Sequence, residues 1–83
     1  RSVARELASR GVTANVVAPG PLSTAMTDAL PEERRAELAG AVPLARFGTC
    51  EEGAAVVAFL CSEAAGYVTG AVVPVDGGLG MGH

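Results

Sequence analysis

The sequence predicts an α/β fold built on a parallel sheet. Two short apolar segments, residues 12–18 and 71–75, have the length and composition of strands, and segments with helical patterns precede and separate them. Both faces of the first segment are largely apolar, one carrying Val12, Ala14, Val16 and Ala18 and the other Thr13, Asn15 and Val17. A strand buried on both faces is typical of a parallel sheet.

Residues 1–10 are expected to form a helix that ends at Gly11. They carry an apolar stripe at helical spacing, which consists of Val3, Ala4, Leu7 and Ala8. The chain begins at Arg1 without a Met and already within this pattern, so we expect residues 1–83 to be part of a longer protein. A mean hydropathy of +0.37 and 49% hydrophobic residues also predict further burial against sheet neighbours, other subunits or both.

The first strand stops abruptly at Pro19 and Gly20. Pro19 cannot donate a ladder hydrogen bond, and Gly20 can adopt a positive φ. In open parallel sheets, ligands bind just outside the carboxyl ends of the strands, where the residues up to Thr24 are expected to lie. The turn therefore has two interpretations, a simple strand terminator or a ligand-binding rim with the Thr24 hydroxyl beside it.

Residues 24–30 and 31–39 predict two short helices, the second with Pro31 in its first turn and Glu32 favourable at its N-terminus. Few apolar side chains anchor this stretch: Met26, Leu30 and Leu38. It is either a movable lid above the strand end or an ordinary surface helical hairpin.

Thr49 and Glu52 form a capping-box pattern that predicts a longer helix over residues 50–62. After its first turn this helix is apolar all round, which predicts burial on all sides, part of it against another subunit. Cys50 is interpreted as a helix-start residue and Cys61 as a buried apolar one. Their spacing is not that of a C-x-x-C pair, so neither a disulfide nor a metal site is expected.

The second strand, residues 71–75, contains Pro74, which favours an edge position or an irregular ladder. Asp76-Gly77-Gly78 ends this strand. Residues 79–83 are expected to form a flexible tail, with His83 either solvated or packed into a neighbouring subunit.

Charge and hydropathy exclude several classes of function. The net charge is -3, from 6 Lys+Arg and 9 Asp+Glu, so no basic stripe is present and nucleic acid is not an expected partner. No apolar run approaches the roughly 20 residues needed to cross a bilayer, and residues 1–10 do not have the layout of a signal peptide. A soluble, cytoplasmic protein is therefore expected.

A series of short motifs accompanies these elements in a fixed order: Arg5-Glu6-Leu7-Ala8, Gly11-Val12 with Asn15 and Pro19-Gly20, Thr24 with Met26-Thr27, Pro43-Leu44 with Arg46 and Gly48, Glu51-Glu52, Phe59-Leu60 with Ser62, Tyr67 with Thr69-Gly70, and Val75-Asp76-Gly77-Gly78. Together they resemble the C-terminal third of the short-chain dehydrogenase/reductase family. Within it the chain is most similar to the 3-oxoacyl-acyl carrier protein reductases, and its ending, residues 80–83, is similar to that of their actinobacterial long-chain members.

The resemblance implies a Rossmann-like, doubly wound and mostly parallel sheet, of which residues 1–83 supply the C-terminal portion of a single domain. It also implies NADPH as cofactor, with hydride transfer from the nicotinamide to a ketone. By position, Pro19 and Gly20 would line the nicotinamide pocket, the backbone of Leu22 would face the carboxamide, and the Thr24 hydroxyl would hydrogen-bond it.

The resemblance further implies a role for Met26 and the short helices after it as a substrate lid. Residues 50–62 and 71–75 would form a face of a homotetramer. The family's glycine-rich phosphate loop, its catalytic Ser and its Tyr-x-x-x-Lys pair would all lie upstream of Arg1, so no catalytic residue is assigned and the chain alone is expected to be inactive. The implied reaction is reduction of 3-oxoacyl-acyl carrier protein in fatty acid biosynthesis.

Two alternatives to this reaction stay open. One is a dehydrogenase for another ketone or alcohol, such as a sugar, polyol, steroid or xenobiotic, and the other is a non-catalytic assembly module. The chain also departs from the family pattern at Cys50, where a helix-starting Pro is usual, and at Pro21, where a larger residue is common. The first departure is expected to weaken helix preorganisation and the second to alter the substrate pocket.

Overall fold

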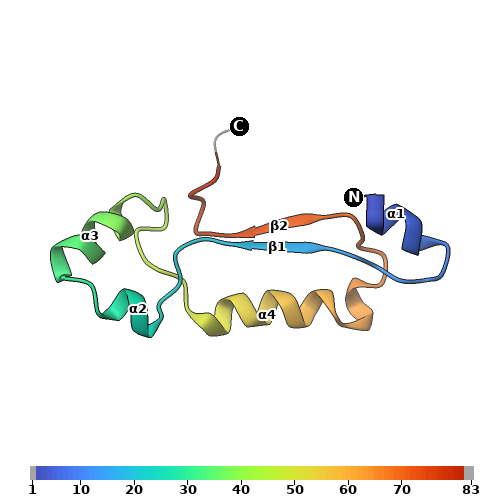
Figure 1. The fold of residues 1–83 in the computed structure, drawn as a ribbon, viewed down its shortest axis with the longest axis horizontal. Coiled ribbons are helices and arrows are strands. Elements are labelled where there is room, and N and C mark those ends of the chain that lie inside the picture. Colours follow the sequence, from blue (N-terminus) through green and yellow to red (C-terminus); the bar gives the residue numbers. More distant parts are fainter. Residues whose placement is uncertain (1, 82–83) are drawn as a thin grey trace.

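Two strands pair in parallel at the centre of the structure, as the sequence predicts (Figure 1). The computed structural model describes residues 2–81. In register, Val16 lies opposite Val72 and Pro19 opposite Val75. The elements in chain order are α1 (Ser2–Ala8), β1 (Val16–Pro19), α2 (Ala25–Asp28), α3 (Glu32–Gly40), α4 (Cys50–Leu60), the 3-10 turn η1 (Glu63–Ala65) and β2 (Val72–Val75).

The helices between the strands form the crossover that parallel pairing requires. Helix α4 runs along the sheet and contacts both strands (Figure 1). Helices α2 and α3 lie beyond the carboxyl ends of the strands, and α1 lies at the opposite end. The crossover therefore places two short helices beside the edge of the sheet where ligands bind in this class of fold.

Strand β1 is shorter than predicted, and side chains make most of the bonds that pair the residues before it, alongside a backbone bond from the N–H of Gly70 to the carbonyl of Ala14 at 2.9 Å. The Asn15 amide donates to the carbonyl of Val68 at 3.1 Å, and its oxygen accepts from the N–H of Ala71 at 3.0 Å. The hydroxyl of Thr69 accepts from the N–H of Ala14 at 3.1 Å. These bonds join the start of β1 to the loop before β2, so they align the two strands before the ladder begins.

The predicted burial of the strands and of α4 is wrong for this chain. Its buried hydrophobic residues are Ala4, Val42 and Ala65. Strand β1 is largely exposed, and α4 has no buried residue; Phe59 remains 50% exposed. The reason is geometric, because within residues 2–81 α4 is the helix that packs along the sheet, and apart from the two strands it contacts mainly the short η1. Cys61, interpreted above as buried, is exposed as well.

Helix boundaries follow local hydrogen bonding. Helix α1 ends at Ala8, before the predicted residue 10, and a turn leads to Gly11. The predicted stop at Gly11 is confirmed, since Gly11 adopts a φ of 72° and donates to the carbonyl of Ala8 at 3.0 Å. Pro31 is the N-cap of α3 and not a residue of its first turn. Helix α4 ends at Leu60, before the predicted Ser62, because both the N–H and the hydroxyl of Ser62 bond the carbonyl of Phe59.

Residues 79–81, the described part of the flexible tail predicted for residues 79–83, form hydrogen-bonded turns. The N–H of Leu79 donates to the carbonyl of Asp76 at 3.1 Å, and that of Met81 donates to the carbonyl of Gly78 at 3.0 Å. The chain therefore continues as consecutive turns to Met81. His83 lies outside the described residues. Across residues 2–81, every helix is too short or too polar to cross a bilayer.

A substitution at Gly20 tests how closely the ends of β1 and β2 approach each other. A Cβ at this position would lie 2.5 Å from the Asp76 Cβ and 2.8 Å from its Cα, so Gly20→Ala forces the backbones apart. We expect a loss of about 1–3 kcal/mol in the free energy of unfolding of the full-length protein, measured by urea denaturation. Gly40→Ala is the matched control, since its Cβ would meet nothing within 4 Å. Equal effects of the two substitutions would contradict the close approach.

Candidate functional site

The carboxyl ends of the two strands meet directly. The N–H of Gly20 donates to the carbonyl of Val75 at 3.0 Å and extends the ladder one residue past β1. Because Gly20 has no side chain, its backbone lies against Asp76. From this point the chain turns away from the sheet toward α2, so the loop after Gly20 starts at the sheet edge.

The loop after Gly20 is paired with a segment far along the chain. Leu22 forms an isolated parallel bridge with Gly48. The N–H of Gly48 donates to the carbonyl of Pro21 at 3.0 Å, and the carbonyl of Gly48 accepts from the N–H of Ser23 at 2.8 Å. The thiol of Cys50, at the start of α4, donates to the carbonyl of Ser23 at 3.3 Å. The backbone on both sides of Leu22 is thereby fixed.

Thr24 has a structural task that the sequence interpretation did not assign to it. It is the N-cap of α2, and its hydroxyl oxygen accepts from the N–H of Thr27 at 3.3 Å. The hydroxyl of Thr27 in turn accepts from the N–H of Thr24 at 2.7 Å, which completes a capping box. The hydroxyl of Thr24 also lies 3.4 Å from that of Thr27, and either oxygen can be the donor in this contact. Because Thr24 is exposed, its hydroxyl proton can turn from this contact to a ligand acceptor.

Met26 lies on the short helix that Thr24 caps. Its side chain is 81% exposed, and α2 has no buried residue. Helix α3, which follows, has no buried residue either. The stretch predicted as a lid or a surface hairpin is thus attached to the rest of the molecule mainly through its ends.

An ion pair stands at the start of α4. Two guanidinium nitrogens of Arg46 donate to the two carboxylate oxygens of Glu52, each at 2.8 Å. Glu52 also accepts from the N–H of Thr49 at 2.8 Å and so completes the predicted capping box, which the structure confirms. The hydrogen bond from Arg46, followed by that from the Thr49 backbone, lowers the pKa of Glu52 to about 2. The same pair raises the pKa of Arg46.

Asp76 organises the turn after β2. Its two carboxylate oxygens accept from the N–H groups of Gly78 at 2.9 Å and Gly80 at 3.0 Å. Gly77 and Gly78 adopt positive φ values of 63° and 94°, which favour glycine. The carbonyl of Gly77 accepts from the N–H of Leu44 at 3.1 Å, so this turn is joined to the segment before α4.

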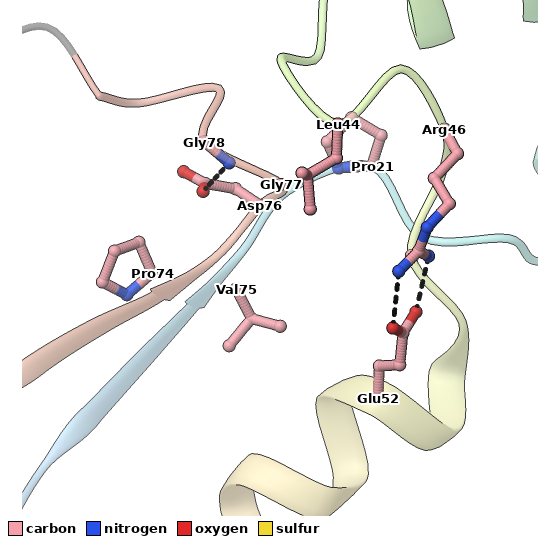
Figure 2. Close-up of a pocket in the computed structure, with 10 residues that line it drawn as sticks. Pro21, Leu44, Arg46, Glu52, Pro74, Val75, Asp76, Gly77 and Gly78 are labelled. Atoms are coloured by element: carbon pink, nitrogen blue, oxygen red, sulfur yellow. Dashed lines mark hydrogen bonds and ion pairs between the residues drawn. The ribbon is translucent and has the colours of Figure 1, made fainter.

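A pocket of about 230 Å³ opens between these parts. Figure 2 shows the Arg46–Glu52 pair on one side of it and the Asp76 turn on the other. Its lining residues come from the strand ends and from the segment that leads into α4: Pro21, Leu44, Arg46, Gly48, Glu52, Pro74, Val75, Asp76, Gly77 and Gly78.

The sequence-predicted residues lie beside this pocket and not in its wall. Pro19 and Gly20 end β1, Leu22 lies in the loop paired with Gly48, and Thr24 caps α2, so the structure brings them together along one edge of the sheet. Sequence reasoning did not assign Arg46 to the site. The sequence does contain an indication of this role, because Arg46 lies six residues before Glu52 of the capping box, and a turn between them allows the two charged side chains to pair.

The chemistry of this edge is that of binding and orientation. It presents backbone N–H and C=O groups, threonine hydroxyls and a carboxylate already paired with a guanidinium. Within residues 2–81, no three His, Cys, Asp or Glu side chains are grouped so that they could hold a metal ion. Cys50 and Cys61 are free thiols.

Parallel strands joined by a helical crossover, with polar loops at their carboxyl ends, define part of a Rossmann-like α/β fold. A family model described as enoyl-(acyl carrier protein) reductase matches residues 1–80. The chain belongs to this family, within the short-chain dehydrogenases/reductases, as the motif order indicates.

Curated relatives support the same family. The chain is 57% identical over 83 residues to the 3-oxoacyl-[acyl-carrier-protein] reductase MabA of Mycobacterium tuberculosis, covering 100% of this chain and 34% of the relative. It is 56% identical over 81 residues to the 3-oxoacyl-[acyl-carrier-protein] reductase FabG of Pseudomonas aeruginosa, covering 98% of this chain and 33% of the relative. The corresponding FabG of Escherichia coli is 51% identical over 81 residues, with 98% and 33% covered. The chain thus spans about a third of the length of these relatives.

The lowered pKa of Glu52 predicts an acid-dependent contribution to stability. Because the pKa is about 2 in the folded chain against an ordinary 4.5, the ionised pair stabilises the fold above about pH 4.5 and loses this effect as the pH falls toward 2. We expect the stability difference between the wild type and Glu52→Gln, both as full-length proteins, to shrink over this range, as measured by urea denaturation.

The matched control for this titration is Glu51→Gln, which removes a charge from the same helical turn. Among residues 2–81, Glu51 has no ion-pair partner. A pH dependence of the same size in Glu51→Gln would show that the helix N-terminus, and not Arg46, is responsible.

Proposed function

We propose that residues 1–83 are the C-terminal portion of one short-chain dehydrogenase/reductase domain. The full-length protein would be an NADPH-dependent 3-oxoacyl-acyl carrier protein reductase of fatty acid biosynthesis. The observation that carries the proposal is the identity of 57% over all 83 residues to a relative named for this activity. When bound, the cofactor supplies a hydride to the ketone carbon of the 3-oxoacyl thioester, which becomes a 3-hydroxyacyl thioester after its oxygen gains a proton.

The contribution of this chain is to orient the nicotinamide, through residues 20–24, which we call the cofactor loop. Pro19 and Gly20 would line the ring pocket, and the backbone of Leu22 would face the carboxamide. The exposed Thr24 hydroxyl would donate to the carboxamide oxygen. Gly20, without a side chain, leaves room at the strand end, and the pairing with Gly48 holds the loop in one conformation. Such fixed orientation is what hydride transfer requires.

The proposal extends to substrate access and assembly. Met26, exposed on a helix without buried residues, suits a lid that closes over substrate and excludes water. Helix α4 and strand β2 would form one face of a homotetramer, since both expose large apolar side chains, Phe59 and Val72 among them. We place the protein in the cytoplasm, where the acyl carrier protein thioester would be its substrate, with neither nucleic acid nor a bilayer as partner.

The activity is tested with the full-length protein, NADPH and an acetoacetyl thioester. Oxidation of NADPH that depends on the thioester supports the proposal, and a comparison with NADH decides the cofactor preference. Turnover of a sugar, polyol, steroid or xenobiotic ketone without turnover of the thioester would support the alternative dehydrogenase. Absence of binding to both NADPH and NADH would contradict a reductase of either kind.

We expect Thr24→Val to lower kcat/KM of the full-length enzyme by an amount equivalent to about 1–3 kcal/mol, because the carboxamide loses its donor. Thr24→Ser keeps the hydroxyl and should retain most of the activity. Thr27→Val controls for local structure, since it removes the reciprocal capping bond and the bond from the Thr27 hydroxyl to the Leu22 carbonyl but leaves the Thr24 hydroxyl in place. Equal losses in Thr24→Val and Thr27→Val would assign the effect to the conformation of the loop and its cap and not to a hydrogen bond with the cofactor.

Residues 1–83 expressed alone are expected to aggregate or to melt without cooperativity, and to lack reductase activity. The physical reason is the small core, whose buried hydrophobic residues are Ala4, Val42 and Ala65, together with an exposed sheet. Analytical ultracentrifugation and thermal melting monitored by circular dichroism provide the measurement. A cooperative melt of a monomer would instead support an independent assembly module.

A further inference from the structure

A tight turn holds one side of the cofactor loop. We call this segment, residues 46–52, the bracing turn. Its Gly48 makes the two backbone hydrogen bonds to Pro21 and Ser23, at 3.0 and 2.8 Å. A Cβ on Gly48 would lie 2.9 Å from the Leu22 Cδ2, at the end of a flexible side chain, and 3.9 Å from the carbonyl oxygen of Pro21, so the backbone hydrogen bonds set the close approach of the two segments. The position of the cofactor loop therefore depends on where the bracing turn holds Gly48.

The bracing turn is itself closed by the ion pair between its two ends. Arg46 and Glu52 meet through two bonds of 2.8 Å, and Arg46 also donates to the carbonyl of Phe47 at 3.1 Å. Glu52 is fixed in turn by the N–H of Thr49. Because the bonds tie together residues on both sides of Gly48, the turn cannot open without separating the pair.

The ion pair between Arg46 and Glu52 is partly exposed, which indicates that it acts on the conformation of the bracing turn and not on the stability of the whole fold. The side chains of Arg46 and Glu52 are 53% and 45% exposed, and exposed ion pairs contribute little to global stability. Two parallel bonds in a planar fork, however, fix the relative geometry of the groups that they join. The ion pair can therefore fix the conformation of the bracing turn, although it contributes little to the free energy of unfolding of the protein.

We propose that Arg46 and Glu52 are positioning residues for the nicotinamide cofactor. Their ion pair closes the bracing turn, and the turn holds the cofactor loop through Gly48. Neither side chain has to contact the cofactor, because a loop that shifts by a fraction of an ångström already misplaces the ring for hydride transfer. This inference rests on the proposed function for its consequence in catalysis, whereas the hold on the loop is a property of the chain itself.

Hydrogen exchange of single amides in the full-length protein tests the hold on the loop. In Arg46→Ala we expect the protection of the Ser23 amide to fall by a factor of roughly 2 to 10, the range of one hydrogen bond. The Val16 amide, bonded to the Ala71 carbonyl at 2.9 Å, reports on the sheet and should keep its protection. Unchanged protection at Ser23, or an equal loss at Ser23 and Val16, would overturn the proposal.

Kinetics of the same variants test the consequence for the cofactor. We expect Arg46→Ala to lower kcat by about tenfold or more while NADPH affinity, measured by fluorescence, changes little, because the ring is misplaced and not released. Arg46→Lys keeps the charge but not the fork and should recover part of kcat. Glu51→Gln should behave as the wild type in both measurements. Wild-type kcat in Arg46→Ala would overturn the positioning role.

The two measurements keep this inference separate from the proposed function. If the wild-type protein neither binds NADPH nor reduces the thioester, the proposed function fails, and a local loss of Ser23 protection still supports the hold of Arg46 and Glu52 on the loop. If the wild type is an active reductase and Arg46→Ala matches it in exchange and kinetics, the inference fails and the proposed function stands.

Discussion

Parallel pairing of β1 with β2 is the interaction on which the rest of the structure depends. Its register sets Pro19 opposite Val75, so both strands end at the same level. Gly20 then meets Asp76, the cofactor loop leaves the sheet at this point, and the turn after β2 reaches the segment before α4. A shift of one residue would separate these groups and turn each side chain to the other face.

Two sets of hydrogen bonds fix the segments at the carboxyl ends of the strands. Asp76 fixes the turn after β2 by accepting from two backbone N–H groups, and the bracing turn fixes the cofactor loop through the backbone of Gly48. Backbone groups make most of these bonds, so the geometry depends on backbone pairing and on the close approach at Gly20 more than on large side chains. This explains why an edge with little buried apolar area still has a defined shape.

Local signals in the sequence predicted much of the fold. The capping box of Thr49 and Glu52, the stop at Gly11 and the parallel pairing were all predictable, because each depends on neighbouring residues or on strand composition. The Asn15 bonds and the pairing of Leu22 with Gly48 were not, since they join residues distant in sequence. Burial of α4 was predicted wrongly because hydropathy records a preference for burial and not the presence of a partner.

The Asn15 bonds have a consequence for how the chain folds. They join residues 53 and 56 positions apart, so the sheet forms only after a long segment has closed into a loop. Such closure has a large entropic cost and slows folding, whereas α4 can form locally from its own capping box. We therefore expect helix formation to precede strand pairing. The amide of Asn15 bonds both the carbonyl of Val68 and the N–H of Ala71, so it lowers the free energy of a non-local contact at the end of the sheet where the ladder begins.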